Sequence, residues 1–248
     1  MAKSSGLGDN YYVAQYDLSG DIGSLGSISG GNEPLDVTAI NASAHERVGG
    51  IRDGTIEFTT FINTAVGQEH AALSPLPTTD VIVSYFRGAT LGDAAASMVA
   101  KQANYDIERG DDGSITASVE ALANAYGLQW GVQLTAGKRT DTAATDGTSV
   151  DLGTGSLAFG LVAFLHVFSF SGTSVTVKIQ ESSDNGAGDA WADVTGGGFT
   201  AATGATSQRI ATSLTQTVER YIRCVTTGTF SSAVFSVNAV RNDTLTAF

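Results

Sequence analysis

Apolar and polar side chains alternate along much of this chain, the pattern of β-strands with one buried face. The clearest case is residues 97–124, where residues 115–121 place small or β-branched apolar side chains at every second position. Thr116, Ser118 and Glu120 occupy the positions between them. This period of two predicts a half-buried antiparallel strand, the second strand of a long hairpin.

The hairpin is predicted to turn within residues 109–113. Gly110, Asp112 and Gly113 supply the Asp-Gly chemistry of a tight reversal, because glycine adopts positive φ without steric cost. The turn therefore divides the hairpin into two strands of similar length.

A second strand with the same division of faces is predicted before it. Ile56 and Phe58 point to one side of residues 55–59, whereas Thr55, Glu57 and Thr59 point to the other. A polar face on a long strand requires a reason, and a water-filled β-barrel or conduit is one such reason. We therefore predict that these polar faces line a lumen, with the candidates Thr55, Glu57, Thr59, Thr116, Ser118 and Glu120.

Other segments of the first half are less regular. Residues 1–10 are small and polar and are predicted to be a flexible N-terminal segment. Residues 19–31 are rich in Gly and Ser but match no phosphate-binding pattern, so a loop or a bulged strand is expected. Residues 67–73 are predicted to be a short helix, which Pro75 and Pro77 would end.

The second half of the chain predicts a β-sandwich of the jelly-roll or Ig-like kind. Residues 157–170 are apolar on both faces, as in a central strand. Residues 135–155 have few large apolar side chains and are expected to be a linker and the first edge of this domain. Further strands are expected at residues 175–180, 218–226 and 233–241, and the domains are expected to be residues 1–139 and 140–248.

Composition agrees with a mainly β protein. The 248 residues include 30 Gly, only 3 Pro and 15% charged residues. The net charge of −12 without a basic stripe argues against tight binding of nucleic acid, although DNA could still pass through such a protein. The lone Cys224 cannot form an intrachain disulfide and is expected to be a small buried residue. No signal peptide and no membrane insertion are expected, because the most apolar run is too short to span a bilayer.

Few residues suggest chemistry. His45, His70 and His166 lack metal-ligand spacing, His166 is expected to be a satisfied core residue, and no nucleophile motif is present. No enzyme and no cofactor are therefore predicted. The loop of residues 183–193 offers Asp184, Asn185, Asp189 and Asp193 as weak calcium candidates, but an Asx-turn hairpin loop explains the same residues. Trp191 in this loop suits either a carbohydrate platform or a packing anchor.

Several runs of the sequence form distinctive motifs. They are Gly-Asp-Asn-Tyr-Tyr-Val at residues 8–13, Gly-Gly-Ile-Arg-Asp-Gly-Thr-Ile-Glu-Phe at 49–58 and Ala-Ala-Ser-Met-Val-Ala-Lys-Gln at 95–102, with shorter runs at 16–24, 76–80, 109–114, 220–223 and 227–230. These runs resemble the major tail proteins, or tail tube proteins, of long-tailed bacteriophages. The resemblance extends over nearly the whole chain, and its motifs are structural rather than chemical.

This resemblance implies a tail tube domain whose hairpins join into a β-barrel across six copies, with an accessory sandwich outside it. It also implies hexameric rings that stack into a tube, contacts with tape-measure and tail terminator or tip proteins, and passage of DNA without specific binding. The protein would then be a virion component, assembled in the host cytoplasm. The alternatives are a capsid decoration or head–tail completion protein, and a carbohydrate- or calcium-binding β-sandwich module.

Overall fold

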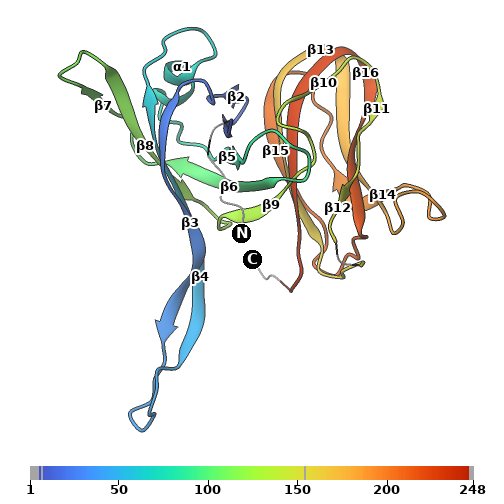
Figure 1. Cartoon of the computed structure of the whole chain (residues 1–248), viewed down its shortest axis with the longest axis horizontal. Helices are drawn as coiled ribbons and strands as arrows, with labels where there is room; N and C mark the ends of the chain where they lie inside the picture. The colour runs from blue at the N-terminus through green and yellow to red at the C-terminus, as the bar shows by residue number, and fades with distance from the viewer. Residues whose placement is uncertain (1–5, 7, 154, 246–248) are drawn as a thin grey trace. The chain divides into compact units, whose positions relative to one another are not determined.

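The computed structural model describes residues 6, 8–153 and 155–245, and it consists almost wholly of β-strands (Figure 1). Hydrogen bonds connect the described strands into one sheet of antiparallel strands, which does not close. The prediction of a mainly β fold is therefore confirmed. Of the predicted flexible N-terminal segment, residues 1–5 and 7 lie outside the described residues, and Asn10 begins the first strand.

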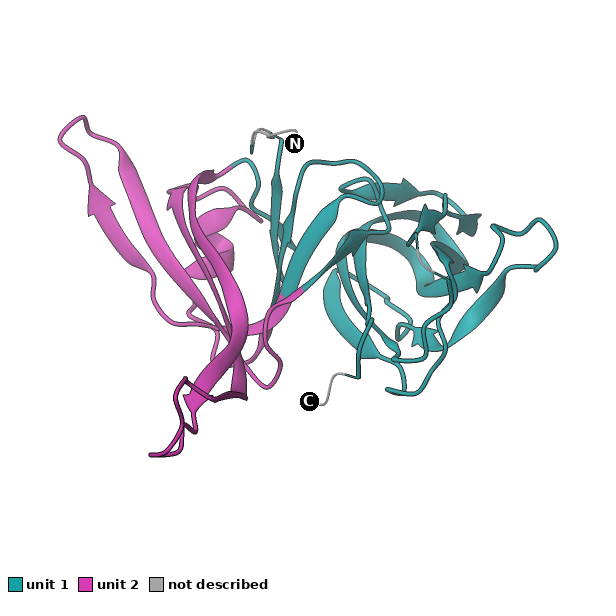
Figure 2. Ribbon diagram, turned by 60° about the horizontal axis from the view of Figure 1, so that its bottom comes forward, with its two compact units in different colours: residues 1–20, 82–97, 130–248 teal, residues 21–81, 98–129 magenta. Residues whose placement is uncertain are grey.

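The chain forms two compact units by its internal contacts (Figure 2). Unit 1 comprises residues 1–20, 82–97 and 130–248, and unit 2 comprises residues 21–81 and 98–129. Each unit is therefore assembled from separate pieces of the sequence. The division into domains of residues 1–139 and 140–248 stays a prediction.

Unit 2 consists of two hairpins and the single described helix, α1. The first hairpin pairs β3 with β4, and β4 also pairs with β8. A second hairpin joins β7 to β8. The bounds are β3 Ile22–Asp36, β4 Arg47–Phe61, α1 Glu69–Leu73, β7 Asp106–Arg109 and β8 Ile115–Ala123.

Two sequence predictions for unit 2 are confirmed. The short helix expected at residues 67–73 is α1, which ends before Pro75 and buries Leu73. The Gly- and Ser-rich residues 19–31 lie largely in β3, whose pairing with β4 contains register shifts. A bulged strand, rather than a loop, is therefore the observed form of this segment.

Unit 1 is dominated by two long strands, β13 and β16. Their lengths were not predicted, because the sequence suggested four separate strands in this part of the chain. β13 and β16 pair almost along their full lengths, and Gly172, which has a positive φ, lies at an irregularity in the pairing. The strands of unit 1 are β1 Asn10–Val13, β2 Tyr16–Asp17, β10 Arg139–Asp141, β11 Thr145–Asp146, β12 Val150–Asp151, β13 Leu161–Ser182, β14 Ala192–Gly198, β15 Thr206–Ala211 and β16 Tyr221–Arg241. Residues of both units occur in β5 Val81–Phe86, β6 Ala94–Gln102 and β9 Gln129–Gln133.

One large hydrophobic cluster forms most of the core of unit 1, and Tyr12, Phe86 and Ala95 form a smaller one. Both halves of β13 contribute to the large cluster, for example Leu165 before the irregularity and Ile179 after it. Phe235 and Cys224 do the same for β16. Both halves of each long strand thus contribute to the same cluster. Burial of the Cys224 thiol raises its pKa to about 12. The residues expected to be a linker and the first edge of the second domain contain the short strands β10, β11 and β12, which pair with β16.

Candidate functional site

The predicted lumen residues lie together on one face of unit 2. In the antiparallel pairing of β4 with β8, Glu57 is directly opposite Glu120, and Thr59 is directly opposite Ser118. Directly opposite residues share a face of an antiparallel sheet. By the same register Thr55 and Thr116 also belong to it. We call this set of six residues the polar face; its exposure to a lumen stays a prediction.

The other side of the same strands is buried. Ile56 has no exposed surface, and Phe58 and Val119 are each 3% exposed. Ala117 and Ala121 are buried beside them. The alternation in the sequence thus corresponds to one apolar side in the core of unit 2 and one polar side outside it.

A shallow hollow of about 300 Å³ lies over the polar face. Glu57 and Glu120 line it together with Ser118 and Asn104. Among the described residues, no ion pair neutralises either glutamate. The hollow is therefore acidic, and it is chemically suited to repelling anions rather than binding them.

Asn104 was not singled out from the sequence. It lies between β6 and β7, both of which pair with β8. Its side-chain oxygen accepts a hydrogen bond from the Glu120 N–H at 2.7 Å, and the Ala103 N–H donates to the Glu120 carbonyl at 2.8 Å. These two bonds continue the pairing of β8 across residues 103–105, which separate β6 from β7. The predicted long hairpin is therefore one ladder with a bulge opposite Glu120.

The hairpin turn has the predicted chemistry. Gly113 has a φ of +88°, which favours glycine. The Asp112 carboxylate accepts hydrogen bonds from the Ser114 hydroxyl at 2.7 Å and the Ser114 N–H at 2.9 Å, and both lower the pKa of Asp112. The Gly110 N–H donates to the Ser114 carbonyl and closes the turn.

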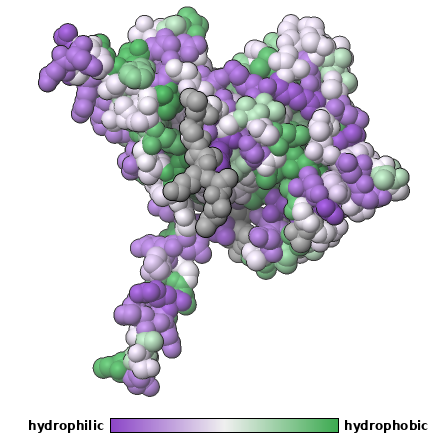
Figure 3. Space-filling model, viewed as in Figure 1, coloured by the Kyte–Doolittle hydropathy of each residue, from purple (hydrophilic) through white to green (hydrophobic). Residues whose placement is uncertain are grey.

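The β3–β4 hairpin continues beyond the rest of unit 2 as a slender two-stranded ribbon (Figures 1 and 3). We call residues 31–53 the extension. Its strands carry exposed apolar side chains, including Leu35, Val48 and Ile51. Ile40, in the loop at its end, is fully exposed.

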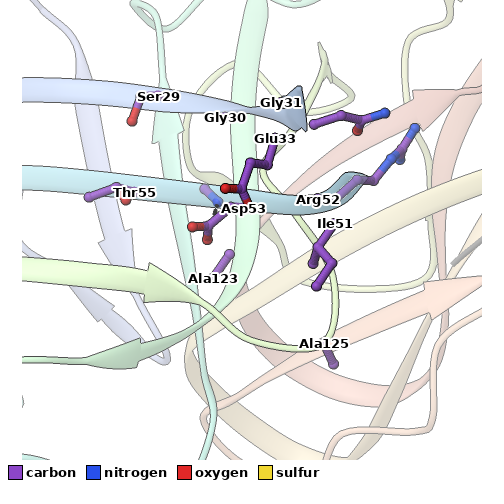
Figure 4. Close-up of a pocket in the computed structure, with 12 residues that line it drawn as sticks. Ser29, Gly30, Gly31, Glu33, Ile51, Arg52, Asp53, Thr55, Ala123 and Ala125 are labelled. Atoms are coloured by element: carbon purple, nitrogen blue, oxygen red, sulfur yellow. Dashed lines mark hydrogen bonds between the residues drawn. The ribbon is translucent and has the colours of Figure 1, made fainter. Parts of the chain in front are cut away.

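A larger hollow of about 800 Å³ lies where the extension leaves the sheet. Figure 4 shows the residues that line it, with Glu33 on β3, Arg52 and Asp53 on β4, Ala123 at the end of β8 and Ala125 in the segment that follows. The Asp53 carboxylate accepts a hydrogen bond from the Gly54 N–H at 2.7 Å. Charged groups of both signs line this hollow, so its lining does not select one charged ligand.

The calcium candidates in unit 1 are engaged within their own loop. The Asp184 carboxylate accepts hydrogen bonds from the N–H groups of Ala187, Gly188 and Asp189. These bonds lower the pKa of Asp184, although burial opposes them. Ser183 donates its N–H to Asp189 at 2.8 Å. Such bonds are those of an Asx-type loop.

The other two calcium candidates also have protein partners. Asn185 accepts a hydrogen bond from the Ser149 hydroxyl, and Asp193 pairs with Lys178 at 2.9 Å. Within the described part of the chain, no group of three or more acidic, cysteine or histidine side chains could hold a metal ion. Trp191 packs against the Arg223 guanidinium, whose central carbon lies 4.6 Å from a ring centroid.

His166 is buried in unit 1 and has partners on both ring nitrogens. Its Nδ1 lies 2.6 Å from the Ala14 carbonyl, and its Nε2 lies 2.7 Å from the Ser84 hydroxyl. Ser84 contacts Ser97, which contacts Asn238. Burial lowers the pKa of His166 to about 4. The expectation of a satisfied core histidine is met by this network.

The remaining histidines lie elsewhere. His45 in the extension contacts Asp36, and His70 in α1 contacts the Tyr105 hydroxyl through Nδ1 at 2.8 Å. The described helix is too short and too polar to cross a membrane.

No protein-family model matches the sequence, and a search of curated proteins finds no similar sequence. Among solved structures, a chain from the tail of an empty GTA particle with C6 symmetry matches at 15% identity and a TM-score of 0.39, over 52% of this chain and 98% of that one. The Dit protein of phage SPP1, a hub of an adsorption apparatus, matches at 12% identity and a TM-score of 0.33, over 94% of this chain and 99% of that one. A chain of the phage p2 baseplate matches at 10% identity and a TM-score of 0.34, over 96% of this chain and 99% of that one. These structural neighbours are phage tail proteins.

Proposed function

We propose that this chain is the structural subunit of a bacteriophage tail tube, in which six copies form a ring and rings stack around a lumen. The observation that carries the proposal is the polar face. A sheet buried on one side and acidic on the other suits a wall between a protein core and a water-filled channel. The ring number comes from the resemblance of the sequence to tail tube proteins.

The charge of the polar face suits passage of DNA. Glu57 and Glu120 would present carboxylates to the phosphates of a passing duplex, so DNA would cross the tube without adhering to it. The net charge of −12 acts in the same direction.

Unpaired strand edges support assembly through unit 2. Within the described residues, β3 pairs only with β4, and β7 pairs only with β8. An exposed edge is a template for a strand of another chain. Pairing around a ring would cover these edges, and the exposed apolar side chains of the extension would gain contacts with neighbouring copies.

The assembled tube would contact tape-measure and tail terminator or tip proteins, and the subunit would assemble in the host cytoplasm and remain in the virion. No catalytic role is proposed.

The first test is negative-stain electron microscopy of the purified protein over a range of concentrations, paired with light scattering. Hollow tubes of uniform width, or six-fold rings that stack, are the expected result. A closed small oligomer that never stacks at any concentration contradicts the proposal and favours a decoration protein.

A second test asks which face lines the lumen. In assembled tubes, Ser118→Cys should react with a small maleimide and react poorly with a maleimide carried on a long polymer. The control Ser183→Cys, on an exposed loop of unit 1, should react with both. Cys224 is fully buried and should stay unlabelled. Equal labelling of Ser118→Cys by both reagents would place the polar face outside the lumen.

A further inference from the structure

Two glycines face each other at the base of the extension. Gly30 of β3 and Gly54 of β4 are directly opposite in the antiparallel register. Leu128 lies against both: a Cβ added at Gly30 would be 2.6 Å from the Leu128 Cβ, and one added at Gly54 would be 2.7 Å from the Leu128 backbone nitrogen. Real Cβ atoms do not approach this closely, so only glycine at both positions admits Leu128.

Leu128 belongs to a short segment held by the rest of unit 2. We call residues 124–128 the buttress loop. The Asn124 N–H donates to the Val99 carbonyl at 2.9 Å, and the Asn124 side chain donates to Asp80 at 2.9 Å. Asp80 in turn pairs with Lys101 at 2.7 Å. The loop is thus tied to β6 at one end and covers the glycine pair at the other.

The loop also contacts β4 beside the glycine pair. A Cβ added at Gly127 would lie 3.0 Å from the Arg52 Cβ and 3.1 Å from the Asp53 carbonyl oxygen. Ala125 has a φ of +66°, an uncommon conformation for a residue other than glycine. A conformation of this kind persists where the surrounding contacts require it.

The extension has few means of fixing its own direction. Between Arg47 and Asp53, β4 pairs only with β3 among the described strands, and the ribbon shifts register between Asn32 and Pro34. Gly31, Gly49 and Gly50 remove side-chain packing there. An isolated two-stranded ribbon is marginally stable.

We infer that the buttress loop fixes the direction in which the extension leaves the rest of unit 2, with Leu128 as the positioning residue. Leu128 packs against the two opposing glycines. The hydrogen bonds of Asn124 to Val99 and Asp80 hold the loop in place. A fixed direction would help rings to stack, and this part of the inference rests on the function proposed above. The packing of the buttress loop on the extension does not depend on that function.

The test measures the direction of the extension within one molecule. Spin labels at Ser43→Cys, in the loop at the end of the extension, and Ala71→Cys, in α1, give a distance distribution by double electron–electron resonance. Both sites are exposed and lie in unit 2, whereas the native Cys224 is buried. The labelled protein is diluted into unlabelled protein, so that distances between copies do not contribute.

The unmodified chain should give one narrow distribution, and Leu128→Ala should widen it at least twofold. The conservative Leu128→Ile should restore most of the narrow distribution. Ile107→Ala, which removes an exposed apolar side chain from β7, serves as the control and should leave the width unchanged. A Leu128→Ala distribution as narrow as that of the unmodified chain overturns the inference.

Circular dichroism and thermal unfolding separate loss of direction from loss of fold. Leu128→Ala should keep the β signal and a cooperative transition. If it does not, Asn124→Ala replaces it as the test variant. This substitution removes the hydrogen bond to Asp80 and should widen the distance distribution in the same way. A chain that forms no tubes but responds as expected contradicts the proposed function and leaves the inference intact. If the unmodified chain forms tubes but neither variant widens the distance distribution, the proposed function stands and the inference is overturned.

Discussion

Glu57 of β4 and Glu120 of β8 are directly opposite each other in the antiparallel register of unit 2. Like charges in this position repel each other and destabilise a sheet. No salt bridge to either residue is found among the described side chains. The Glu57–Glu120 pair therefore lowers the stability of the single subunit. The same pair makes the hollow over the polar face acidic.

Replacing one member of this pair should stabilise the isolated subunit. Glu57→Gln removes the repulsion and should raise the free energy of unfolding by about 0.2–1 kcal/mol. The gain should shrink as salt is added, because ions screen exposed charges. Urea unfolding at low and high salt measures both effects. Glu108→Gln is the matched control, since Glu108 is opposite Thr116 rather than another acid; an equal gain from it would contradict the pairing argument.

His166 should make the folded chain sensitive to acid. Its folded-state pKa of about 4 lies below the value of about 6.5 in the unfolded chain, because burial disfavours the charged ring. As pH falls from 6.5 towards 4, the unfolded chain binds a proton that the folded chain excludes, and stability is lost. The expected loss is on the order of 1–3 kcal/mol.

Urea unfolding at several pH values between 7 and 4.5 measures this loss. His166→Gln should be less stable at pH 7 but should show a flatter dependence on pH. If His166→Gln keeps the original slope, other groups cause the acid sensitivity.

Glu219 should have the opposite effect on unit 1. Burial and the neighbouring carboxylates of Asp189, Glu181 and Asp184 raise its pKa to about 7. The unfolded chain loses this proton near pH 4.5, so stability falls as pH rises from about 4.5 to 7. Because Glu219 is partly exposed, we expect only about 1 kcal/mol. Glu219→Gln should be more stable than the unmodified chain at pH 8 and similar to it at pH 4, as thermal unfolding would show; a constant difference between the two at all pH values would rule out this titration.

Calcium should not stabilise the loop of residues 183–193. The Asp184 carboxylate already accepts N–H groups of its own loop, and Asp193 already pairs with Lys178. Thermal unfolding with millimolar calcium and with a chelator should therefore give the same midpoint. A saturable rise in the midpoint that Asp189→Asn abolishes would instead support a calcium site.

The sequence anticipated the local features of unit 2 well. The alternation around Ile56 and Val119 depends only on the two-residue period of a strand, so both the buried and the polar face followed from it. The turn at Gly113 and the helix before Pro75 followed from the backbone preferences of single residues. The loop interpretation of Asp184 rested on the same short-range chemistry.

Longer-range features could not be obtained in this way. The sequence divided β13 and β16 into shorter strands with gaps that contain Gly172 and Gly228. A glycine looks like a break in a sequence whether the strand ends there or only bends. Residues 135–155 resemble a linker since they have few large side chains, yet they form short strands along β16. Neither outcome can be decided without the partner strand.

The sequence by itself determined the strand-rich fold, the two faces of β4 and β8 and the tight turns, because each depends on neighbours within a few residues. Only the tertiary structure decided that Glu57 opposes Glu120, that Asn104 bonds to the backbone of Glu120, and that Leu128 covers Gly30 and Gly54. These contacts join residues far apart in the chain. Their distances depend on strand register and on the path of the intervening loops, which the packing of the whole unit sets.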